Sequence, residues 1–528
     1  MELTTSYRRL RRRGGLPVVF ARVLLAALLA GCASRPAPQS LPQEHAAAAR
    51  SAGAFAVVED GISRAHGPGR SGFNLLERSD RALQWRLALI DSARHSIDMQ
   101  YYVWFGDAAG TLFMLRVLEA ADRGVKVRIL FDDLNTMLRD MATVELRDAI
   151  VARIDGHSNI QIRVFNAWQD RSLPGRMLDM VVDFERLNRR MHNKQMIVDN
   201  HAVILGGRNL ADEYFGLNPT FNFYDLDVLG IGPVARQASA VFDRYWNSEW
   251  AQRVPAIDRA PGAPSLADMR ASDLAALTAH PSLKASVGGR RDWSPQIAEL
   301  QEQLAVGIGV VHTDPPARDR FTRNHMPEAI RVLMRSAQRE ILITNAYIIP
   351  DASFMGDLRE AVARGVTVRI LTNSLSSHDV PAVNSHYQRW RKPLVETGAS
   401  LYELRFDAAL REEVVEIPPN RGEFVGLHTK AMVVDRARAF VGSMNLDPRS
   451  EVLNSEMGVV IDSFALAENL ARRMERDMGG ANSWQVLLEQ DGNLRWRSDA
   501  GELDHQPSRG VWQVVQDFVF KFFPADLY

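Results

Sequence analysis

Two stretches of the chain repeat the same order of hydrophobic and polar positions. Residues 96–102 and 340–345 have the apolar, β-prone pattern of strands. A helical stretch follows each of them, and then an octet, 123–130 or 364–371, in which an arginine and a glycine precede a β-branched run. The glycine is placed to end the helix, and the β-branched residues begin the next strand. The pattern predicts a strand–helix–strand unit that occurs twice.

This repeat predicts the fold class and the organisation of the chain. Alternating strands and helices are typical of α/β folds with parallel or mixed sheets. We therefore expect two α/β halves, each a mixed β-sheet flanked by helices. The expected segments are a signal peptide (1–31), a flexible tether (32–72), the first half (73–255), a connector (256–304), the second half (305–490) and a C-terminal apolar segment (491–528).

The C-terminal segment is apolar almost all round where it reads as a helix, in residues 511–515 and 518–523. Two interpretations remain open. The segment forms a buried helix that closes the fold, or it lies at a membrane surface or along a substrate tunnel.

Charge argues against a nucleic-acid binder. The 528 residues carry a formal net charge of −1. Residues 1–31 contain six arginines and one acid, so the remainder has 57 basic and 63 acidic residues and a net charge of −6. Proteins that bind nucleic acid usually present a basic surface. A local basic patch is still possible, but no nucleic-acid partner is expected.

The single cysteine, Cys32, follows a short apolar run. The arginine cluster, the apolar segment and the small residues before Cys32 have the order of a secretory signal. An uncleaved membrane anchor is the alternative, but Leu16 to Ala30 spans only 15 residues and includes Arg22, against about 20 for a spanning helix. The ending Leu-Ala-Gly-Cys resembles a bacterial lipobox. This resemblance implies lipidation at Cys32, and Ala33 after it implies an exported chain at the periplasmic face of the outer membrane.

The most informative part of the repeat is a polar motif with matching spacing. Each copy reads as a strand, a turn at an aspartate and a second strand, so the histidine and lysine share one face and the hairpin brings the distant asparagine back beside them. The first copy has His192, Lys194, Asp199, Gly206, Gly207 and Asn209, and the second has His428, Lys430, Asp435, Gly442, Ser443 and Asn445.

The two motifs resemble the HxK(x)4D(x)6GSxN signature of the phospholipase D superfamily, over roughly residues 73–490. The resemblance implies two phospholipase D-like halves in a pseudo-twofold arrangement and a phosphodiester-cleaving site. One neutral histidine attacks phosphorus, and the other serves as acid and then base. The lysines and asparagines stabilise the developing negative charge. We expect His192, Lys194, Asn209, His428, Lys430 and Asn445 to be catalytic, with His192 favoured as the nucleophile, and we expect no cofactor and no metal.

Other motif residues receive supporting roles. By resemblance, Asp227 and Glu456 are the acids that orient the histidines. Asp199 and Asp435 are expected to be structural because aspartate stabilises turns. Gly207 departs from the motif, where Ser443 has the expected serine. A hydroxyl contact is therefore missing from the first half-site, and the symmetry of the two halves is in doubt.

Several runs, among them residues 96–102, 189–194 and 371–375, are similar to bacterial cardiolipin synthases of the C type. This implies glycerophospholipid substrates, phosphatidylglycerol and phosphatidylethanolamine, at a membrane surface, and cardiolipin formation from phosphatidylglycerol. The alternatives are phospholipase D hydrolysis to phosphatidic acid, a phosphodiesterase or nuclease with a non-lipid substrate, and an inactive binding module. The intact motif positions argue against the last of these. The acceptor, water or a lipid alcohol, stays open.

Overall fold

The computed structural model describes residues 41–521 apart from 134–150, 169–174, 176–177, 180–181, 255–263 and 317–322. The signal peptide and Cys32 lie outside the described residues. The first half and the connector contain β1 (Ser71–Leu76), β2 (Ser96–Tyr101), β3 (Lys126–Asp132), β4 (Ile160–Phe165), β5 (Gln195–Val198), β6 (Ala202–Gly206), β7 (Phe221–Tyr224), β8 (Asp227–Ile231) and β9 (Ala251–Arg253), with α2 (Ala54–His66), α3 (Ser79–Ser92), α4 (Ala108–Asp122), α7 (Phe184–Leu187), α8 (Pro233–Trp246), α9 (Leu266–Ala279) and α10 (Ser294–Gln303).

The remainder of the chain forms the second half and the C-terminal segment. It contains β10 (Ala305–Thr313), β11 (Glu340–Asn345), β12 (Thr367–Asn373), β13 (Ser400–Leu404), β14 (Phe424–Leu427), β15 (Lys430–Val434), β16 (Arg438–Gly442), β17 (Met457–Asp462), β18 (Ser483–Leu488), β19 (Leu494–Ser498) and β20 (Gly501–Leu503), with α11 (Met326–Arg335), α12 (Ala352–Ala363), α13 (Pro381–Tyr387), α14 (Arg391–Glu396), α15 (Pro448–Val452), α16 (Phe464–Asp477) and α17 (Val511–Phe520).

The predicted strand–helix–strand units are present in both halves. β2–α4–β3 and β11–α12–β12 each form a parallel pair with the helix as crossover. Gly124 and Gly365 follow these helices with φ of 93° and 85°, the left-handed backbone that ends a helix at little cost in glycine. Aspartate begins both helices, because the side chains of Asp107 and Asp351 accept backbone N–H groups of the first turn.

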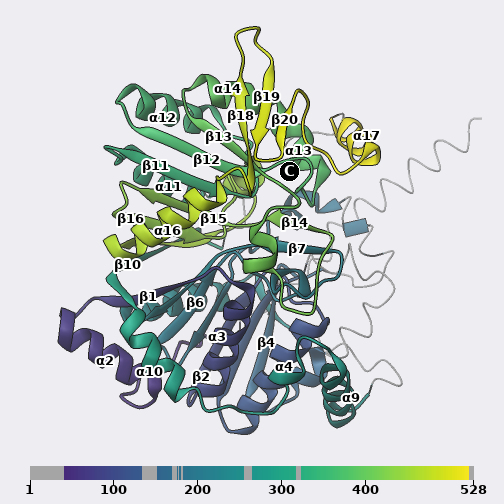
Figure 1. Ribbon diagram of the computed structural model, residues 1–528. Helices are drawn as coiled ribbons and strands as arrows, with labels where there is room; N and C mark the ends of the chain where they lie inside the picture. Colours follow the sequence, from purple (N-terminus) through teal and green to yellow (C-terminus); the bar gives the residue numbers. More distant parts are fainter. Residues whose placement is uncertain are drawn as a thin grey trace, which may run out of the picture.

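The two sheets have the same strand order and join at one edge. Neighbours run β1-β8-β6-β5-β2-β3-β4-β9 in the first half and β10-β17-β16-β15-β11-β12-β13-β18 in the second, with only β2-β3-β4 and β11-β12-β13 parallel. β1 pairs antiparallel with β10. Figure 1 shows the first half, purple to teal, below the second, green to yellow. The expected fold of two mixed α/β halves is confirmed.

A shared core fixes the halves against each other. α8 packs on β10, and α16 packs on β1, so each of these helices contacts the sheet of the other half. Phe73, Trp246, Ile461 and Leu466 belong to one continuous buried cluster that includes both helices. β7 and β14 form a second contact as a parallel pair. Residues that lie between the shared core and the β7–β14 pair are therefore fixed in position by both halves.

The expected boundaries need two corrections. The tether was extended too far, because α2 packs Phe55, Val58 and Ile62 into the core of the first half at helical spacing. The described part of the connector belongs to the first half, since α9 packs on α4 and α10 packs on α2. In the part of the chain that is described, no helix is both long and apolar enough to span a bilayer.

Candidate active site

The two histidine–lysine segments lead into matching β-hairpins. The turns are at Asp199 and Asn200 and at Asp435 and Arg436, with φ between 51° and 60° in all four residues. Each aspartate carboxylate accepts three backbone N–H groups at the start of the adjacent strand, β2 or β11. The donors are Arg94, His95 and Ser96 for Asp199, and Gln338, Arg339 and Glu340 for Asp435. These contacts support the structural role expected of both aspartates.

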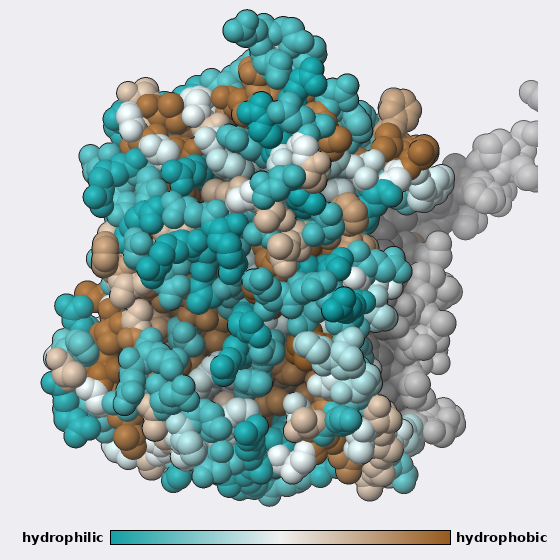
Figure 2. Space-filling model, in the orientation of Figure 1, coloured by the Kyte–Doolittle hydropathy of each residue, from teal (hydrophilic) through white to brown (hydrophobic). Residues whose placement is uncertain are grey.

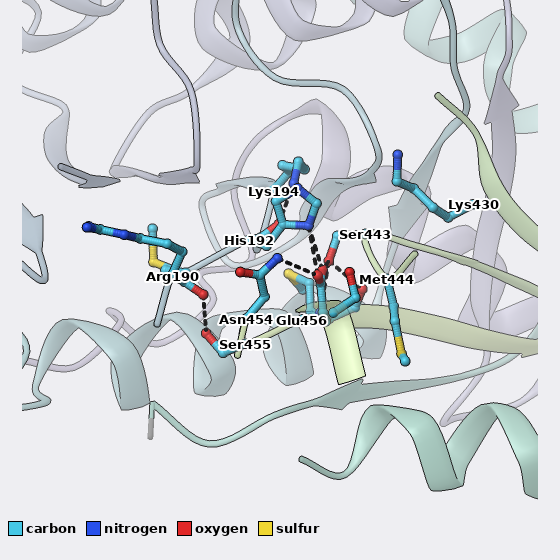
Figure 3. Close-up of polar contacts among 12 residues, drawn as sticks. Arg190, His192, Lys194, Lys430, Ser443, Met444, Asn454, Ser455 and Glu456 are labelled. Atoms are coloured by element: carbon cyan, nitrogen blue, oxygen red, sulfur yellow. Dashed lines mark hydrogen bonds and ion pairs between the residues drawn. The ribbon is translucent and has the colours of Figure 1, made fainter. Parts of the chain in front are cut away.

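Each histidine hydrogen-bonds a carboxylate from the other half. His192 Nδ1 lies 2.8 Å from a carboxylate oxygen of Glu456, which immediately precedes β17. His428 Nδ1 lies 2.6 Å from Asp225 Oδ2, two residues before β8. All four side chains are buried. The two half-sites therefore form one site between the halves, and each half fixes the orientation of the other half's histidine (Figure 3 shows the His192–Glu456 pair).

Backbone contacts across the pseudo-twofold axis hold these pairs in place. The His192 N–H donates to the Ser455 carbonyl, and the His428 N–H donates to the Tyr224 carbonyl, at 2.8 Å in both cases. Ser455 and Tyr224 each lie one residue before the carboxylate that the histidine bonds. The same local geometry is thus built twice, with the halves exchanged.

Asp227 is a correction: it does not orient a histidine. Its carboxylate accepts from Arg86 at 2.9 Å and from Arg208 at 3.2 Å, and all three side chains are buried. The strand register gives the reason. Gly206 pairs with Asp227, whereas Gly442 pairs with Gly458. Glu456 therefore corresponds to the residue two before Asp227, which is Asp225, and Asp227 is a structural ion-pair partner.

Gly206 and Gly442 allow the strand that carries the acid to pass close to the motif. A Cβ atom on Gly206 would lie 2.6 Å from the Leu226 carbonyl oxygen, and one on Gly442 would lie 2.6 Å from that of Met457. Such distances are far inside van der Waals contact. The two motif glycines are therefore required by packing, in agreement with a structural role.

The glycine–serine difference between the motifs matches the acids beside them. Ser443 Oγ donates to Glu456 at 2.5 Å. A Cβ atom on Gly207 would lie 2.1 Å from Asp225 Oδ1, so the aspartate carboxylate occupies the space that a serine would take. The first half-site uses a short acid beside a glycine, and the second uses a long acid held by a serine.

The lysines and asparagines lie in the same buried region. Lys194 Nζ donates to the His192 carbonyl and Lys430 Nζ to the His428 carbonyl, at 2.5 Å each. Asn209 Nδ2 donates to Tyr214 Oη at 2.9 Å, so its amide is engaged by a neighbouring phenol. All six side chains predicted to be catalytic from the motifs, Asn445 included, are buried.

Aromatic rings enclose the histidines. Tyr102 contacts His192 edge-on with ring centroids 5.1 Å apart. Tyr214 contacts His428 in the same way at 5.2 Å, and Phe223 lies 4.8 Å from it. Tyr214, Phe223 and Asp225 were not identified from the sequence as site residues. Only Asp225 has a sequence signal, because Asp225-Leu226 before Val228 aligns with Glu456-Met457 before Val459.

Comparison with known proteins agrees with this duplicated site. The family model described as "Cardiolipin synthase, PLD-like domain" matches residues 87–246 and 330–478, one segment in each half. The chain belongs to the phospholipase D superfamily. Both matched segments contain one complete histidine–lysine motif.

Two relatives and one solved structure match most of the chain. Cardiolipin synthase C of Escherichia coli (strain K12) is 33% identical over 469 residues, which is 87% of this chain and 96% of that protein. Major cardiolipin synthase ClsA of Bacillus subtilis (strain 168) is 27% identical and covers 74% of this chain and 66% of its own length. The crystal structure of phosphatidylserine synthase of Haemophilus influenzae Rd KW20 shares the fold, with a TM-score of 0.51, 14% identity, and 80% and 91% of the two chains covered. The expected family and an enzyme of the phospholipase D type are confirmed.

Burial makes the two histidine–acid pairs of this phospholipase D site electrostatically different. Burial, with Lys194 and Lys430 nearby, holds the pKa of His192 well below its usual range. Burial also raises the pKa of Glu456 to about 7. At neutral pH His192 is therefore an unprotonated imidazole.

The second pair keeps its carboxylate charged. Burial acts to raise the pKa of Asp225, but His428, Lys430 and Arg208 outweigh it and lower the pKa. Burial and Lys430 lower the pKa of His428, and Asp225 opposes this shift. Of the two histidines, His428 is thus the one whose protonated form is stabilised by an ionised partner.

Both motif lysines are held in a poorly solvated position. Burial lowers the pKa of Lys194 well below its usual range and lowers that of Lys430 to about 8. A bound phosphodiester would supply the negative charge that keeps both ammonium groups protonated. Among the described residues, no three His, Cys, Asp or Glu side chains come together in a cluster that could hold a metal ion.

Proposed function

We propose that this chain is a phosphatidyltransferase that forms cardiolipin from phosphatidylglycerol through a phosphohistidine intermediate. The observation that supports it most is the exchange of acids between halves, which places two oriented histidines and two lysines in one buried site. The cardiolipin synthases among the relatives favour a glycerophospholipid substrate. Phospholipase D hydrolysis, with water as acceptor, is the second candidate.

In the first step His192 attacks the phosphorus of phosphatidylglycerol. Its Nδ1 is bonded to Glu456, which leaves Nε2 with the lone pair that attacks. A P–N bond forms, the P–O bond to the headgroup glycerol breaks, and His428 gives its proton to the leaving alkoxide. Lys194 and Lys430 stabilise the charge that gathers on the phosphoryl oxygens.

The second step transfers the phosphatidyl group. A hydroxyl of a second phosphatidylglycerol loses its proton to His428 and attacks phosphorus. The P–N bond breaks, and His192 is released with its lone pair. Two phosphatidylglycerol molecules thus give one cardiolipin and one glycerol, and the proton on His428 is restored.

The electrostatic difference between the pairs supports this assignment of roles. A nucleophile must be unprotonated, and burial with two nearby lysines keeps His192 in that form. A general acid must carry a proton; burial and Lys430 lower the pKa of His428, but the ionised Asp225 opposes this shift and favours the protonated form.

Choice of acceptor depends on position rather than on intrinsic reactivity. Water is present at about 55 M, so a lipid alcohol can compete only if it is held in place, where effective molarities reach roughly 10⁵ M. We propose that lipidation at Cys32 confines the enzyme to the periplasmic face of the outer membrane, in the plane that contains donor and acceptor lipids. Phosphatidic acid is then a side product.

Radiolabelled phosphatidylglycerol in vesicles, followed by thin-layer chromatography, tests the product. We expect labelled cardiolipin with less phosphatidic acid. Phosphatidic acid alone, at every phosphatidylglycerol content, would make the enzyme a hydrolase. Palmitate labelling tests the anchor. A Cys32→Ala variant that still carries the palmitate label after denaturation in acid would contradict lipidation at Cys32.

Substitution of the two histidines tests the shared mechanism. His192→Ala should abolish turnover and covalent labelling. His428→Ala should abolish turnover of phosphatidylglycerol but still release nitrophenolate and accumulate phosphohistidine from a nitrophenyl phosphodiester, because that leaving group needs no acid. His312→Ala, outside the site, is the matched control. Half the activity in either single variant would indicate two independent sites.

A further inference from the structure

The C-terminal helix α17 is amphipathic in the inverted sense: its polar side chains are buried and its apolar ones are exposed. Gln513 and Asp517 are 7% and 2% exposed. Val511 and Trp512 are 82% and 71% exposed, and Val519 is 48% exposed. A helix that stabilises a soluble core does the opposite. The structure therefore excludes the buried closing helix that the composition allowed.

The buried polar face attaches the helix through specific hydrogen bonds. Asp517 accepts from Asn384 on α13 at 2.6 Å and from Gln388 at 3.2 Å. Gln513 Nε2 donates to the Leu375 carbonyl at 2.5 Å. Because these bonds use the two polar residues of one face, the helix cannot turn its valines inward without leaving a buried polar group unsatisfied. The outward orientation of the apolar face is fixed.

The apolar face is continuous and bounded by cations. At 100° per residue, Val511, Trp512, Val515 and Val519 fall within one side of the helix. Figure 2 shows brown atoms at the place of α17 on the upper right of the molecule. Arg509 just before the helix and Lys521 just after it are both exposed. Apolar and aromatic residues flanked by basic ones are typical of helices that lie in the membrane interface.

The helix lies next to segments that enter the active site. Leu375, whose carbonyl Gln513 bonds, precedes Asp379 by four residues, and Asp379 contributes to the electrostatic field at Lys430. The Arg509 guanidinium stacks on Phe424, four residues before His428. A surface that contacts α17 would therefore contact the protein beside the second half-site.

We propose that α17 inserts its apolar face into the surface of an anionic phospholipid bilayer and so holds the active site against the membrane. The proposal rests on the proposed function only in taking a bilayer lipid as substrate. The bilayer offers acyl chains to Val511, Trp512, Val515 and Val519, and phosphates to the flanking cations. A second copy of the chain would have to offer a similar apolar surface, without the need for those cations.

Depth of insertion tests the proposal without any turnover. In a full-length Cys32→Ala background, an environment-sensitive fluorophore is attached to Val515→Cys, or to Val57→Cys as matched control. Val57 is also exposed, at 61%, but lies on α2 at the opposite end of the molecule in Figure 1. Both proteins are bound to vesicles of phosphatidylglycerol and phosphatidylethanolamine that carry nitroxide on the acyl chains.

We expect a blue-shifted emission at position 515 and quenching several-fold stronger than at position 57. Equal, water-like emission at both positions would overturn the proposal. A blue shift at 515 that appears without vesicles and grows with protein concentration would identify a second copy as the occupant and would also overturn it.

A second experiment separates docking from catalysis. The triple variant Val511→Ser, Val515→Ser and Val519→Ser should lose about tenfold or more of its turnover on vesicles. Turnover of a soluble short-chain phosphodiester should stay within twofold, and Val57→Ser should change neither. Equal losses on both substrates would show damage to the site and contradict the docking role. Failure of the wild type to form any lipid product would refute the proposed function and leave the insertion result standing.

Discussion

Replacement of Asp225 by asparagine removes the charge beside His428 with almost no change in shape. The carboxylate lies 2.6 Å from His428 Nδ1 and is fully buried. An asparagine oxygen can still accept the Nδ1–H of the neutral ring, but it cannot stabilise the imidazolium. In the proposed mechanism, the variant therefore loses the general acid that protonates the leaving alkoxide.

The expected loss is large. A neutral amide in place of the carboxylate of a buried histidine–acid pair costs on the order of 10³–10⁴ in kcat, or about 4–5.5 kcal/mol of transition-state stabilisation. With a nitrophenyl phosphodiester the loss should shrink to about 10–100-fold, because nitrophenolate leaves without a proton. Unfolding by urea should change little, since the fold keeps both partners in place.

Asp227→Asn is the matched comparison two residues away. It leaves Arg86 and Arg208 buried with a weakened partner. Breaking a buried ion pair costs roughly 3–5 kcal/mol of stability. We expect a lower urea midpoint, with kcat of the folded fraction within about tenfold of the wild type.

Steady-state kinetics on both substrates, with urea unfolding of each variant, measure these effects. The reasoning is refuted if Asp227→Asn abolishes turnover at unchanged stability while Asp225→Asn remains active. An equal loss of kcat on both substrates in Asp225→Asn would also contradict the argument that Asp225 acts through protonation of the leaving group.

Three further predictions follow from the site. Gly207→Ser restores the family motif yet should lower kcat about 10–100-fold, because the new Cβ displaces the Asp225 carboxylate. The double variant Gly207→Ser with Asp225→Glu should recover part of that loss. Full activity of Gly207→Ser alone would contradict the steric argument. Burial lowers the pKa of Lys430 to about 8, so kcat/KM should fall as pH rises above about 8 and the ammonium loses its proton. The alkaline fall of kcat should lie at higher pH, because a bound phosphodiester favours the charged form of Lys430. An alkaline fall at the same pH in both profiles would contradict this role of Lys430. Asp199→Ala, which leaves three backbone N–H groups without an acceptor, should cost about 2–4 kcal/mol in urea unfolding, and Asp435→Ala less, since that carboxylate is more exposed; a loss below about 0.5 kcal/mol for Asp199→Ala would refute the capping role.

The sequence predicts what depends on spacing within one element. The repeat, the hairpins and the motif side chains follow from strand and helix periods, so the fold and six site residues could be anticipated. The orienting acid in the first half could not be found by counting, because Asp225 lies 16 residues after Asn209 whereas Glu456 lies 11 after Asn445. A local alignment of Asp225-Leu226 before Val228 with Glu456-Met457 before Val459 points to Asp225, and the strand register decides between Asp225 and Asp227.

Tertiary contacts decide the remaining features. The aromatic neighbours of His428 come from a short 3-10 helix, which ends at Tyr214, and from β7, whose position depends on the pairing with β14. The apolar residues of α17 do not by themselves determine which face of the helix is exposed. Gln513 and Asp517 determine it through hydrogen bonds to the Leu375 carbonyl and from Asn384.

The exchange of acids between halves has a consequence for the symmetry of the chain. A single half of this kind contains a histidine and an acid that cannot reach each other, so by itself it has no oriented nucleophile. Two identical copies related by a twofold axis would complete each other, as in any interface where each subunit presents the same surface. The chain therefore has the arrangement of a twofold dimer within one polypeptide. Because both halves belong to one chain, their site residues need not be identical, as the pairs Gly207 with Asp225 and Ser443 with Glu456 show.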